Sequence, residues 1–331
     1  NSRISLSNND ASGAVGTTIF GYLAGDDIAS GGINNTLFGH NAGNELKLAD
    51  NNVAIGKDAM FNSFISDAQE VYTKENVYIG TLAGGGAWTT AGSLGNVGIG
   101  AYSSDSSQNG AQYNTAVGFG SSGELISGKF NVAIGAESGK ATSSGTNNIA
   151  IGSWDNSDGG AIIKGALGSN TDGKYNIAIG TGALSTANED DNDGSIAIGH
   201  LACAVQAGTG GAQFTNATVG IGYKALTALT TGAGNTAVGY ESMADNTTGA
   251  YNTAFGYQAG HHMVPGGATP SWNTYIGYQS GFYMDDGASN VGVGYRALYS
   301  NASEANDGAD NVAVGRNALM SLTDGYKNVA L

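Results

Sequence analysis

The sequence predicts an all-β fold, a parallel β-roll or β-solenoid of about 16–17 short two-strand coils. Glycine makes up 56 of the 331 residues, about 17 %, against roughly 7 % in an average protein. Many of these glycines recur at near-regular spacings, each after a short apolar segment that alternates with a period of two. A helical fold is disfavoured, because glycine in a helix interior costs about 1 kcal/mol relative to alanine.

The repeat consists of Asn, then Val, Thr or Ile, then often Ala, then Ile, Val or Phe, and finally Gly. Sixteen glycines anchor it, and Asn328 to Leu331 begin a seventeenth copy. The shortest spacing between anchors is 17 residues and occurs six times, so longer spacings indicate insertions. Ala or Ser follows three residues after the anchor in fifteen of the sixteen copies. Representative pairs of first residue and anchor are Asn52 and Gly56, Asn131 and Gly135, Asn148 and Gly152, Asn235 and Gly239, Asn252 and Gly256, and Asn311 and Gly315.

Physical chemistry assigns a role to each part of the repeat. The β-branched alternation of residues 148–152 is typical of a strand. Asn tolerates the left-handed backbone region and suits the turn that enters the strand, while Gly ends the strand where φ is positive or the backbones approach closely. The second half, such as residues 223–229, places Ala and Leu at another inward position and predicts a second short strand. We therefore expect each coil to bury about two Val or Ile and one or two Ala or Leu side chains.

The repeat defines the predicted domain organisation and assembly. Residues 1–16 are a lead-in, and residues 17–331 form one continuous array that stops inside a repeat, as expected of a segment of a longer chain. Such thin coils bury little apolar surface, so we expect several chains to pack side by side through small Ala and Gly faces. A homotrimeric rod is the expected assembly. A three-sided β-helix fits less well, since it would show three equivalent apolar positions per coil.

Charge and cysteine content exclude several functions. The formal net charge is −15, which disfavours binding to nucleic acid and to anionic membrane surfaces. No apolar run approaches the roughly 20 residues of a membrane span, so no membrane insertion is expected in this segment. Cys203 is the single cysteine and cannot form an intrachain disulfide. We expect it to be a small buried side chain, the alternative being a reactive thiol.

The segments 131–135, 148–152 and 311–315 read Asn-Val-Ala-Ile-Gly, Asn-Ile-Ala-Ile-Gly and Asn-Val-Ala-Val-Gly. This repeat resembles that of YadA-like trimeric adhesin heads, and the longer form in 234–240 and 245–249 is similar to repeats of tail-fibre-like proteins of marine phages. The resemblance covers nearly the whole chain. It implies a left-handed parallel β-roll, three copies of which assemble side by side. The family's short unit is shorter than the 17 residues found here.

No motif indicates catalysis, and we expect a non-enzymatic chain without a cofactor. Residues 123–129 fit Gly-x4-Gly-Lys, but Phe130 stands where a phosphate loop needs Ser or Thr. Glu189, Asp191 and Asp193 resemble the front half of a calcium loop, the alternative being a solvated acidic turn, since His200 stands where a bidentate Glu is needed.

The histidines give a second place to look for a metal. His40 and His200 directly follow anchor glycines and are expected at the surface. His261 and His262 form a pair in a loop near Pro265. Two adjacent residues alone make a poor metal site, so no metal is expected there from the sequence.

Aromatic residues are the candidate binding residues. Tyr113, Phe130, Tyr175, Tyr251 and Trp272 directly precede the repeat Asn and predict either a stacked column that seals chain contacts or a stripe that binds carbohydrate. Trp88 and Trp154 lie outside this register in inserted loops, where an exposed aromatic is a better binding candidate. The insertions between residues 56 and 80, 152 and 180, and 199 and 222 are where a uniform shaft could acquire a distinct surface.

These observations together predict a non-enzymatic trimeric fibre segment, from a phage tail fibre, a virion fibre or a surface adhesin. It would project outward and present host- or surface-binding loops at an extracellular or virion surface. Its expected partners are its own copies and a host-surface glycan or protein receptor. The alternative is a purely structural extracellular filament or spacer with no ligand of its own. An ice-binding face fits poorly, because the residue after the repeat Asn varies among Thr, Val and Ile.

Overall fold

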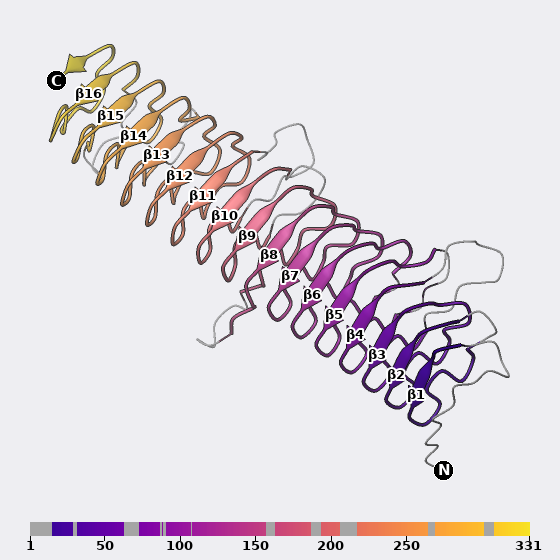
Figure 1. Ribbon diagram of the computed structural model, residues 1–331. Coiled ribbons are helices and arrows are strands. Elements are labelled where there is room, and N and C mark those ends of the chain that lie inside the picture. Colours follow the sequence, from indigo (N-terminus) through magenta and orange to yellow (C-terminus); the bar gives the residue numbers. More distant parts are fainter. Residues whose placement is uncertain are drawn as a thin grey trace. The chain divides into compact units, whose positions relative to one another are not determined.

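The computed structural model describes residues 15–28, 32–62, 73–86, 88, 91–106, 108–156, 163–186, 193–205, 217–263, 269–300 and 308–331. These residues form strands joined by turns, without a helix, so the all-β prediction is confirmed. The chain divides into two compact units, Asn1–Asp172 and Gly173–Leu331. Each unit is a parallel β-solenoid in which short strands stack coil upon coil (Figure 1). The predicted lead-in, residues 1–16, lies almost entirely outside the described residues, and the first strand begins at Thr18.

One strand corresponds to each predicted repeat. In the described part of the first unit the strands are β1 (Thr18–Phe20), β2 (Thr36–Phe38), β3 (Val53–Ile55), β4 (Val77–Ile79), β5 (Val97–Ile99), β6 (Thr115–Val117), β7 (Val132–Ile134) and β8 (Ile149–Ile151). In the described part of the second unit they are β9 (Ile177–Ile179), β10 (Ile196–Ile198), β11 (Val219–Ile221), β12 (Thr236–Val238), β13 (Thr253–Phe255), β14 (Thr274–Ile276), β15 (Val291–Val293), β16 (Val312–Val314) and β17 (Val329–Ala330).

The pairing register follows the sequence repeat. Within each unit every strand pairs in parallel with the strand of the next coil, and equivalent repeat positions stand opposite each other. Examples are Val132 with Ile149 and Ala133 with Ala150 in the first unit, and Thr236 with Thr253 in the second. Residues that occupy the same position of successive repeats are therefore neighbours across one strand spacing, about 4.8 Å.

The prediction of two strands per coil is wrong in its second half. The segment after each anchor glycine, such as residues 223–228, forms tight turns, with left-handed φ angles of 53° at Lys224 and 52° at Leu226. Apart from one antiparallel bridge between Asp155 and Ile163, the further pairing among the described residues is a column of single parallel bridges in the first unit, running from Asp50 to Thr146. Alternating backbone handedness turns the chain within a few residues, which an extended strand could not do.

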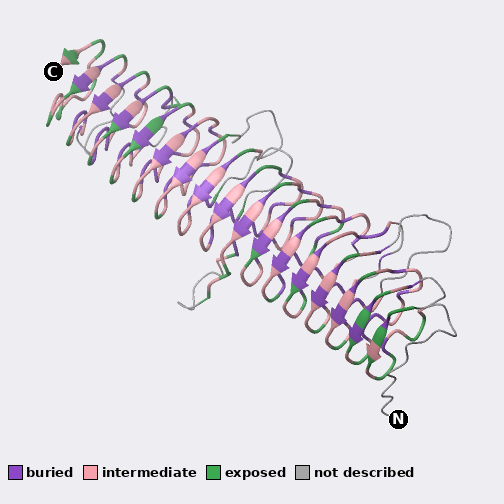
Figure 2. Ribbon diagram, viewed as in Figure 1, coloured by how far each residue is buried: buried purple, intermediate pink, exposed green. Residues whose placement is uncertain are grey.

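The predicted orientation of the strands is also wrong. In every strand from β2 to β16 the middle residue is buried, while the first and third residues are half-buried or exposed (Figure 2). The small Ala133 and Ala150 therefore point inward, and the larger Val132 and Ile134 point outward. The inward position in β2 to β16 carries Ala or Gly except at Leu37, Tyr78 and Tyr275, and buried side chains of the turn segments, such as Leu226 and Leu229, fill the rest of the narrow interior. The Ala and Gly faces that were predicted to contact other chains are used inside this one.

The anchor glycine is required by the close stacking of the coils. At Gly118 the φ angle is 135°, and a Cβ atom would lie 2.6 Å from the carbonyl oxygen of Gly135 in the next coil. Gly135 stands in the same relation to Gly152. The predicted reasons for glycine at this position, a positive φ angle and close backbone approach, are both confirmed.

The repeat asparagine has a different role from the predicted one. It does not adopt the left-handed conformation; the residue before it does, with φ near 58° at Asn51 and 57° at Phe130. The asparagine is buried instead and bonds to its counterparts in the neighbouring coils. Asn52 accepts at Oδ1 from both the backbone N–H (3.0 Å) and the Nδ2 (3.0 Å) of Asn76, and Asn76 accepts in the same way from Asn96. Each Nδ2 also donates to a backbone carbonyl, such as that of Thr73 or Ser93.

The interior is filled mainly by alanine and leucine, and larger side chains are matched to glycines. Tyr78 is fully buried, and its strand partner in β5 is Gly98, where a Cβ atom would lie 2.5 Å from the Tyr78 ring. Tyr275 is likewise opposite Gly292. The third residue after the anchor is buried at Ala59, Ala83 and most equivalent positions, as the repeat predicted. Within the described part of the chain, no helix has the length and apolar character needed to cross a membrane.

Cys203 belongs to this interior. It is fully buried, and burial raises the pKa of its thiol to about 12. Gly220 in the neighbouring strand leaves room for its sulfur atom. The prediction of a small buried side chain is confirmed, and a thiol that stays protonated is a poor nucleophile.

Candidate functional site: surface columns and a histidine–carboxylate cluster

The outer face of the strands is an apolar surface made of the first and third residues of each coil. The third position carries Ile, Val or Phe; Ile134 is 40 % exposed and Phe255 57 %. Phe20 and Phe38 stack on each other there, with ring centroids 4.8 Å apart. Apolar side chains at this position recur from coil to coil within each unit, so the exposed apolar surface is contiguous. Contiguous apolar surface of this kind is typical of an interaction site.

A second column consists of the residue directly after the anchor glycine. In the second unit this position carries Tyr in five successive coils, and His200 precedes them. Neighbouring rings stack nearly parallel, with centroids 5.0–5.5 Å apart and interplanar angles of 4–18°. About 40 % of each tyrosine is exposed. This tyrosine column is made of Tyr223, Tyr240, Tyr257, Tyr278 and Tyr295.

Charged side chains lie close to the tyrosine column. Desolvation, followed by the Glu241 carboxylate, raises the pKa of Tyr240 above its usual value. Cationic groups lie beside its ends: Lys224 Nζ is 5.3 Å from the Tyr223 ring centroid, and Arg296 Cζ is 5.4 Å from that of Tyr295. The stacked rings cover one another's faces, so the column presents ring edges to a ligand.

Sequence reasoning missed the tyrosine column, although a signal was available. His40 and His200 were assigned to the variable position after the anchor, and the structure confirms His40 as exposed and His200 as half-buried. The same position carries Tyr in five later coils. Alignment of the repeats by their anchor glycines would have placed the five tyrosines in one column.

The aromatic column predicted at the position before the repeat Asn is present as two separate stacked pairs. Tyr113 stacks on Phe130 with ring centroids 5.4 Å apart, and Tyr251 stacks on Trp272 at 6.5 Å. These residues and Tyr175 are 48–64 % exposed and have left-handed φ angles of 55–59°. An aromatic residue in that conformation has a more strained backbone than Gly or Asn would have. In the structure, stacking of the rings offsets this strain. Binding of a ligand by these rings stays a prediction.

The two loop tryptophans behave differently. Trp88 is completely buried and packs edge-on against Tyr78, with ring centroids 6.1 Å apart. The prediction of an exposed binding aromatic is wrong for Trp88, because its indole lies in the core beside the Tyr78 ring. Trp154 is 38 % exposed and stays a candidate. The central parts of the three predicted insertions (residues 63–72, 157–162 and 206–216) lie outside the described residues.

The candidate calcium ligands are only partly described. Glu189 and Asp191 lie outside the described residues. Asp193 accepts a hydrogen bond of 2.6 Å from the backbone N–H of Lys174, which links two coils of the second unit. This contact favours the alternative of an acidic turn at Asp193.

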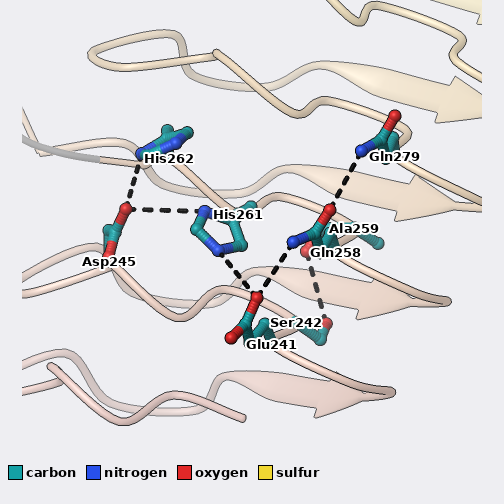
Figure 3. A network of polar contacts seen from close by, with 8 residues as sticks. All are labelled: Glu241, Ser242, Asp245, Gln258, Ala259, His261, His262 and Gln279. Atoms are coloured by element: carbon teal, nitrogen blue, oxygen red, sulfur yellow. Dashed lines mark hydrogen bonds and ion pairs between the residues drawn. The ribbon is translucent and has the colours of Figure 1, made fainter. Parts of the chain in front are cut away.

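The histidine pair, by contrast, has acidic neighbours that the sequence did not suggest. His262 Nδ1 lies 2.5 Å from Asp245 Oδ2, and His261 Nδ1 lies 3.4 Å from the same oxygen atom. His261 Nε2 is 3.5 Å from Glu241 Oε2 (Figure 3). The polar contact with His261 is the main cause that lowers the pKa of the Asp245 carboxyl, and His262 adds to it. Asp245, His261 and His262 are the only group of three or more such side chains, among the described residues, with ligand atoms within 4.8 Å of one another.

The solenoid brings this cluster together through repeat register. Asp245 and His262 each stand six residues after an anchor glycine, in successive coils of the second unit. The backbone N–H of Asp245 donates to the carbonyl of His261, and that of His262 donates to the carbonyl of Phe282. Alignment by anchors would therefore have predicted the contact between Asp245 and His262.

Comparison with known proteins adds no assignment. No protein-family model matches the chain, and no curated protein is significantly similar to it in sequence.

Proposed function

We propose that the chain is a non-enzymatic segment of a homotrimeric fibre, either a phage tail or virion fibre or a surface adhesin. The segment projects outward at an extracellular or virion surface and presents surfaces that bind a host glycan or protein receptor. The repeat architecture, which resembles that of trimeric adhesin heads and tail fibres, supports this proposal. Function then resides in side chains displayed on a regular scaffold and not in a reactive centre.

The exposed apolar face of the strands is the observation that supports the proposed trimer. Most coils expose two apolar or β-branched side chains beside a buried small one, as in Val132, Ala133 and Ile134. A soluble single chain rarely exposes such a contiguous apolar surface, whereas a symmetric homo-oligomer buries the same face of every copy. The proposed contact is therefore made by Val, Ile, Thr and Phe, and not by the Ala and Gly faces expected from the sequence.

The exposed aromatic columns support a binding role over a bare spacer. Trp272, at 64 %, and Tyr251, at 58 %, are among the most exposed aromatic residues of the described chain. Tyr, Trp and Arg dominate the energetics of binding surfaces, and the tyrosine column has Arg296 beside its last ring. Carbohydrate is the ligand class we favour, because aromatic rings and phenol groups contact sugars without requiring charge.

Sedimentation equilibrium of the 331-residue chain tests the assembly. The expected mass is three times that of the 33.1 kDa chain. A folded species that stays at the mass of one chain over the accessible concentration range would contradict the trimer.

A glycan array tests the binding role. The chain is expected to bind one group of related glycans, and a Tyr251→Ala/Trp272→Ala variant of unchanged mass is expected to lose that signal. Tyr326→Ala is the control, because Tyr326 is 58 % exposed and lies in neither aromatic column. No signal on the array for a correctly assembled chain would favour the alternative, a structural filament or spacer without a ligand.

A further inference from the structure

We infer that Asp245, His261 and His262 form a binding site for a divalent transition-metal ion such as Zn²⁺. The three residues supply two imidazole nitrogens and one carboxylate oxygen that converge from two successive coils. Two imidazoles with one carboxylate suit zinc and its neighbours in the first transition row, whereas calcium and magnesium prefer oxygen ligands alone. This inference is independent of the fibre's assembly and receptor.

The ligand atoms are spaced as a metal requires after small movements. Bonds of about 2.0–2.2 Å in tetrahedral geometry separate ligand atoms by roughly 3.3 Å. His261 Nδ1 is already 3.4 Å from Asp245 Oδ2. His262 Nδ1, at 2.5 Å from the same oxygen, needs to move outward by less than an ångström, to about 3.3 Å. Both His262 and Asp245 side chains are more than a third exposed, so an ion and one or two waters can reach them.

A buried polar atom also points to a ligand at this place. His261 Nδ1 is buried and lies 3.4 Å from Asp245 Oδ2, but it makes no hydrogen bond with the described residues. The other ring nitrogen of His261, Nε2, faces Glu241 Oε2 at 3.5 Å. Histidines that bind metals usually direct their second ring nitrogen at a carboxylate or carbonyl, which fixes the tautomer and leaves the first nitrogen for the metal. Glu241 fills that supporting role here.

Glu241 is itself held in place by a chain of hydrogen bonds. Gln258 Nε2 donates to Glu241 Oε2 (2.9 Å), and Gln279 Nε2 donates to Gln258 Oε1 (2.9 Å), as Figure 3 shows. Arg296 Nε donates in turn to Gln279 Oε1 (3.0 Å). All four residues stand two positions after an anchor glycine, so one repeat position supplies the whole support.

The two imidazole rings are also fixed by stacking. His261 lies parallel to Phe282 with ring centroids 5.0 Å apart, and His262 lies parallel to Tyr283 at the same distance, with 3° between the planes. Both stacking partners lie on the next coil, and imidazole rings held in this way need little ordering when they bind an ion. A surface ion pair alone would not require the support of Glu241, Gln258 and two stacked aromatic rings.

Isothermal titration of the metal-stripped 331-residue chain with Zn²⁺ tests the site. We expect saturable binding of one ion per chain. Asp245→Asn and His262→Gln are each expected to weaken it at least tenfold, and Glu241→Gln by about tenfold, as is usual for a supporting carboxylate. Asp58→Asn is the matched control: it removes a carboxylate 3.8 Å from His40, where no second imidazole lies nearby, and should leave Zn²⁺ affinity unchanged.

A measurement on the unmodified chain guards against variants that fail to fold. Cu²⁺ bound to the wild-type chain should give electron spin-echo modulation from two imidazole nitrogens. Equal Zn²⁺ affinity of wild type, Asp245→Asn and His262→Gln would overturn the inference, as would the absence of imidazole modulation. Preference of the chain for Ca²⁺ over Zn²⁺ would also overturn it.

Discussion

Asn52 satisfies its whole side-chain amide inside the stack of coils. Its Oδ1 accepts two hydrogen bonds from Asn76, and its Nδ2 donates to Asn35 Oδ1 and to the carbonyl of Thr73. Only an amide offers an acceptor with two lone pairs and two donors in one small planar group. Where the repeat has Ser195 instead, its backbone N–H still donates to Asn176 Oδ1, but a hydroxyl cannot supply the two donors of an amide.

Replacement of Asn52 by Ala should therefore lower the free energy of unfolding by about 2–4 kcal/mol, since it leaves the buried backbone N–H and one Nδ2 hydrogen of Asn76 without an acceptor. The neighbouring Asn51 is exposed and has a left-handed φ angle of 58°, so Asn51→Gly is the matched control and should cost only a few tenths. Denaturant unfolding at equal protein concentration measures both variants. Equal destabilisation by the two would show that the buried column is not what stabilises the coils.

The anchor glycine is the second feature of the repeat for which a single substitution gives a prediction, and Gly118 is the example. In Gly118→Ala a Cβ atom would approach the Gly135 carbonyl oxygen to 2.6 Å at a φ angle of 135°. Backbone strain and overpacking together should destabilise the chain by about 2 kcal/mol or more. Gly194 also has a positive φ angle, of 70°, but a Cβ atom there would meet nothing within 4 Å. Thermal unfolding should accordingly place Gly194→Asn close to wild type and Gly118→Ala well below it.

At the scale of the strand, the identity of each inward residue depends on the coils beside it. Tyr78 fills the interior around β4, donates a hydrogen bond of 2.5 Å to Gln108 Oε1, and stands opposite Gly98. Alanine is the usual residue at the Gly98 position, as at Ala116 and Ala133. The glycine is thus explained by its neighbour and not by the backbone of its own strand.

Gly98→Ala should destabilise the chain by about 1–3 kcal/mol, because its methyl group would overlap the Tyr78 ring. The same substitution should cost less in a Tyr78→Leu background, where the ring is absent. A double-mutant cycle by denaturant unfolding measures this coupling, which we expect to exceed about 0.5 kcal/mol. Additive effects of the two changes would contradict direct packing of residue 98 on residue 78.

The sequence was sufficient to locate the strands, but not to orient them. Residues 148–152 predicted a strand, and β8 occupies Ile149–Ile151. A period of two shows that Ile149 and Ile151 share a face, yet it cannot tell which face is inside. The usual assumption that the larger apolar residues point inward fails here: the small Ala150 is the buried residue, and both isoleucines are half-buried on the outer face. The contact of Asp245 with His262 was missed for another reason: repeats of unequal length hide shared positions until they are aligned by their anchors.

At the scale of the whole molecule, the outward strand residues make a specific prediction about assembly. Ile134 is the third residue of β7 and is 40 % exposed in the single chain. Ile126 is 44 % exposed but lies in the turn segment that precedes the same coil's strand. In one isolated chain the two isoleucine side chains are similarly exposed to water, so Lys at either position should leave the fold intact.

In the proposed trimer the two positions are no longer equivalent. Ile134→Lys would put a charge into a buried contact between chains, which costs several kcal/mol unless the charge is paired. We therefore expect sedimentation equilibrium to show Ile134→Lys dissociated towards single chains at concentrations where wild type and Ile126→Lys remain trimeric. Circular dichroism should show the same β-content for all three, which separates loss of assembly from loss of fold. A trimer that tolerates Lys at residue 134 but dissociates with Lys at residue 126 would place the contact on the turns, and the strand face would then be free for another partner.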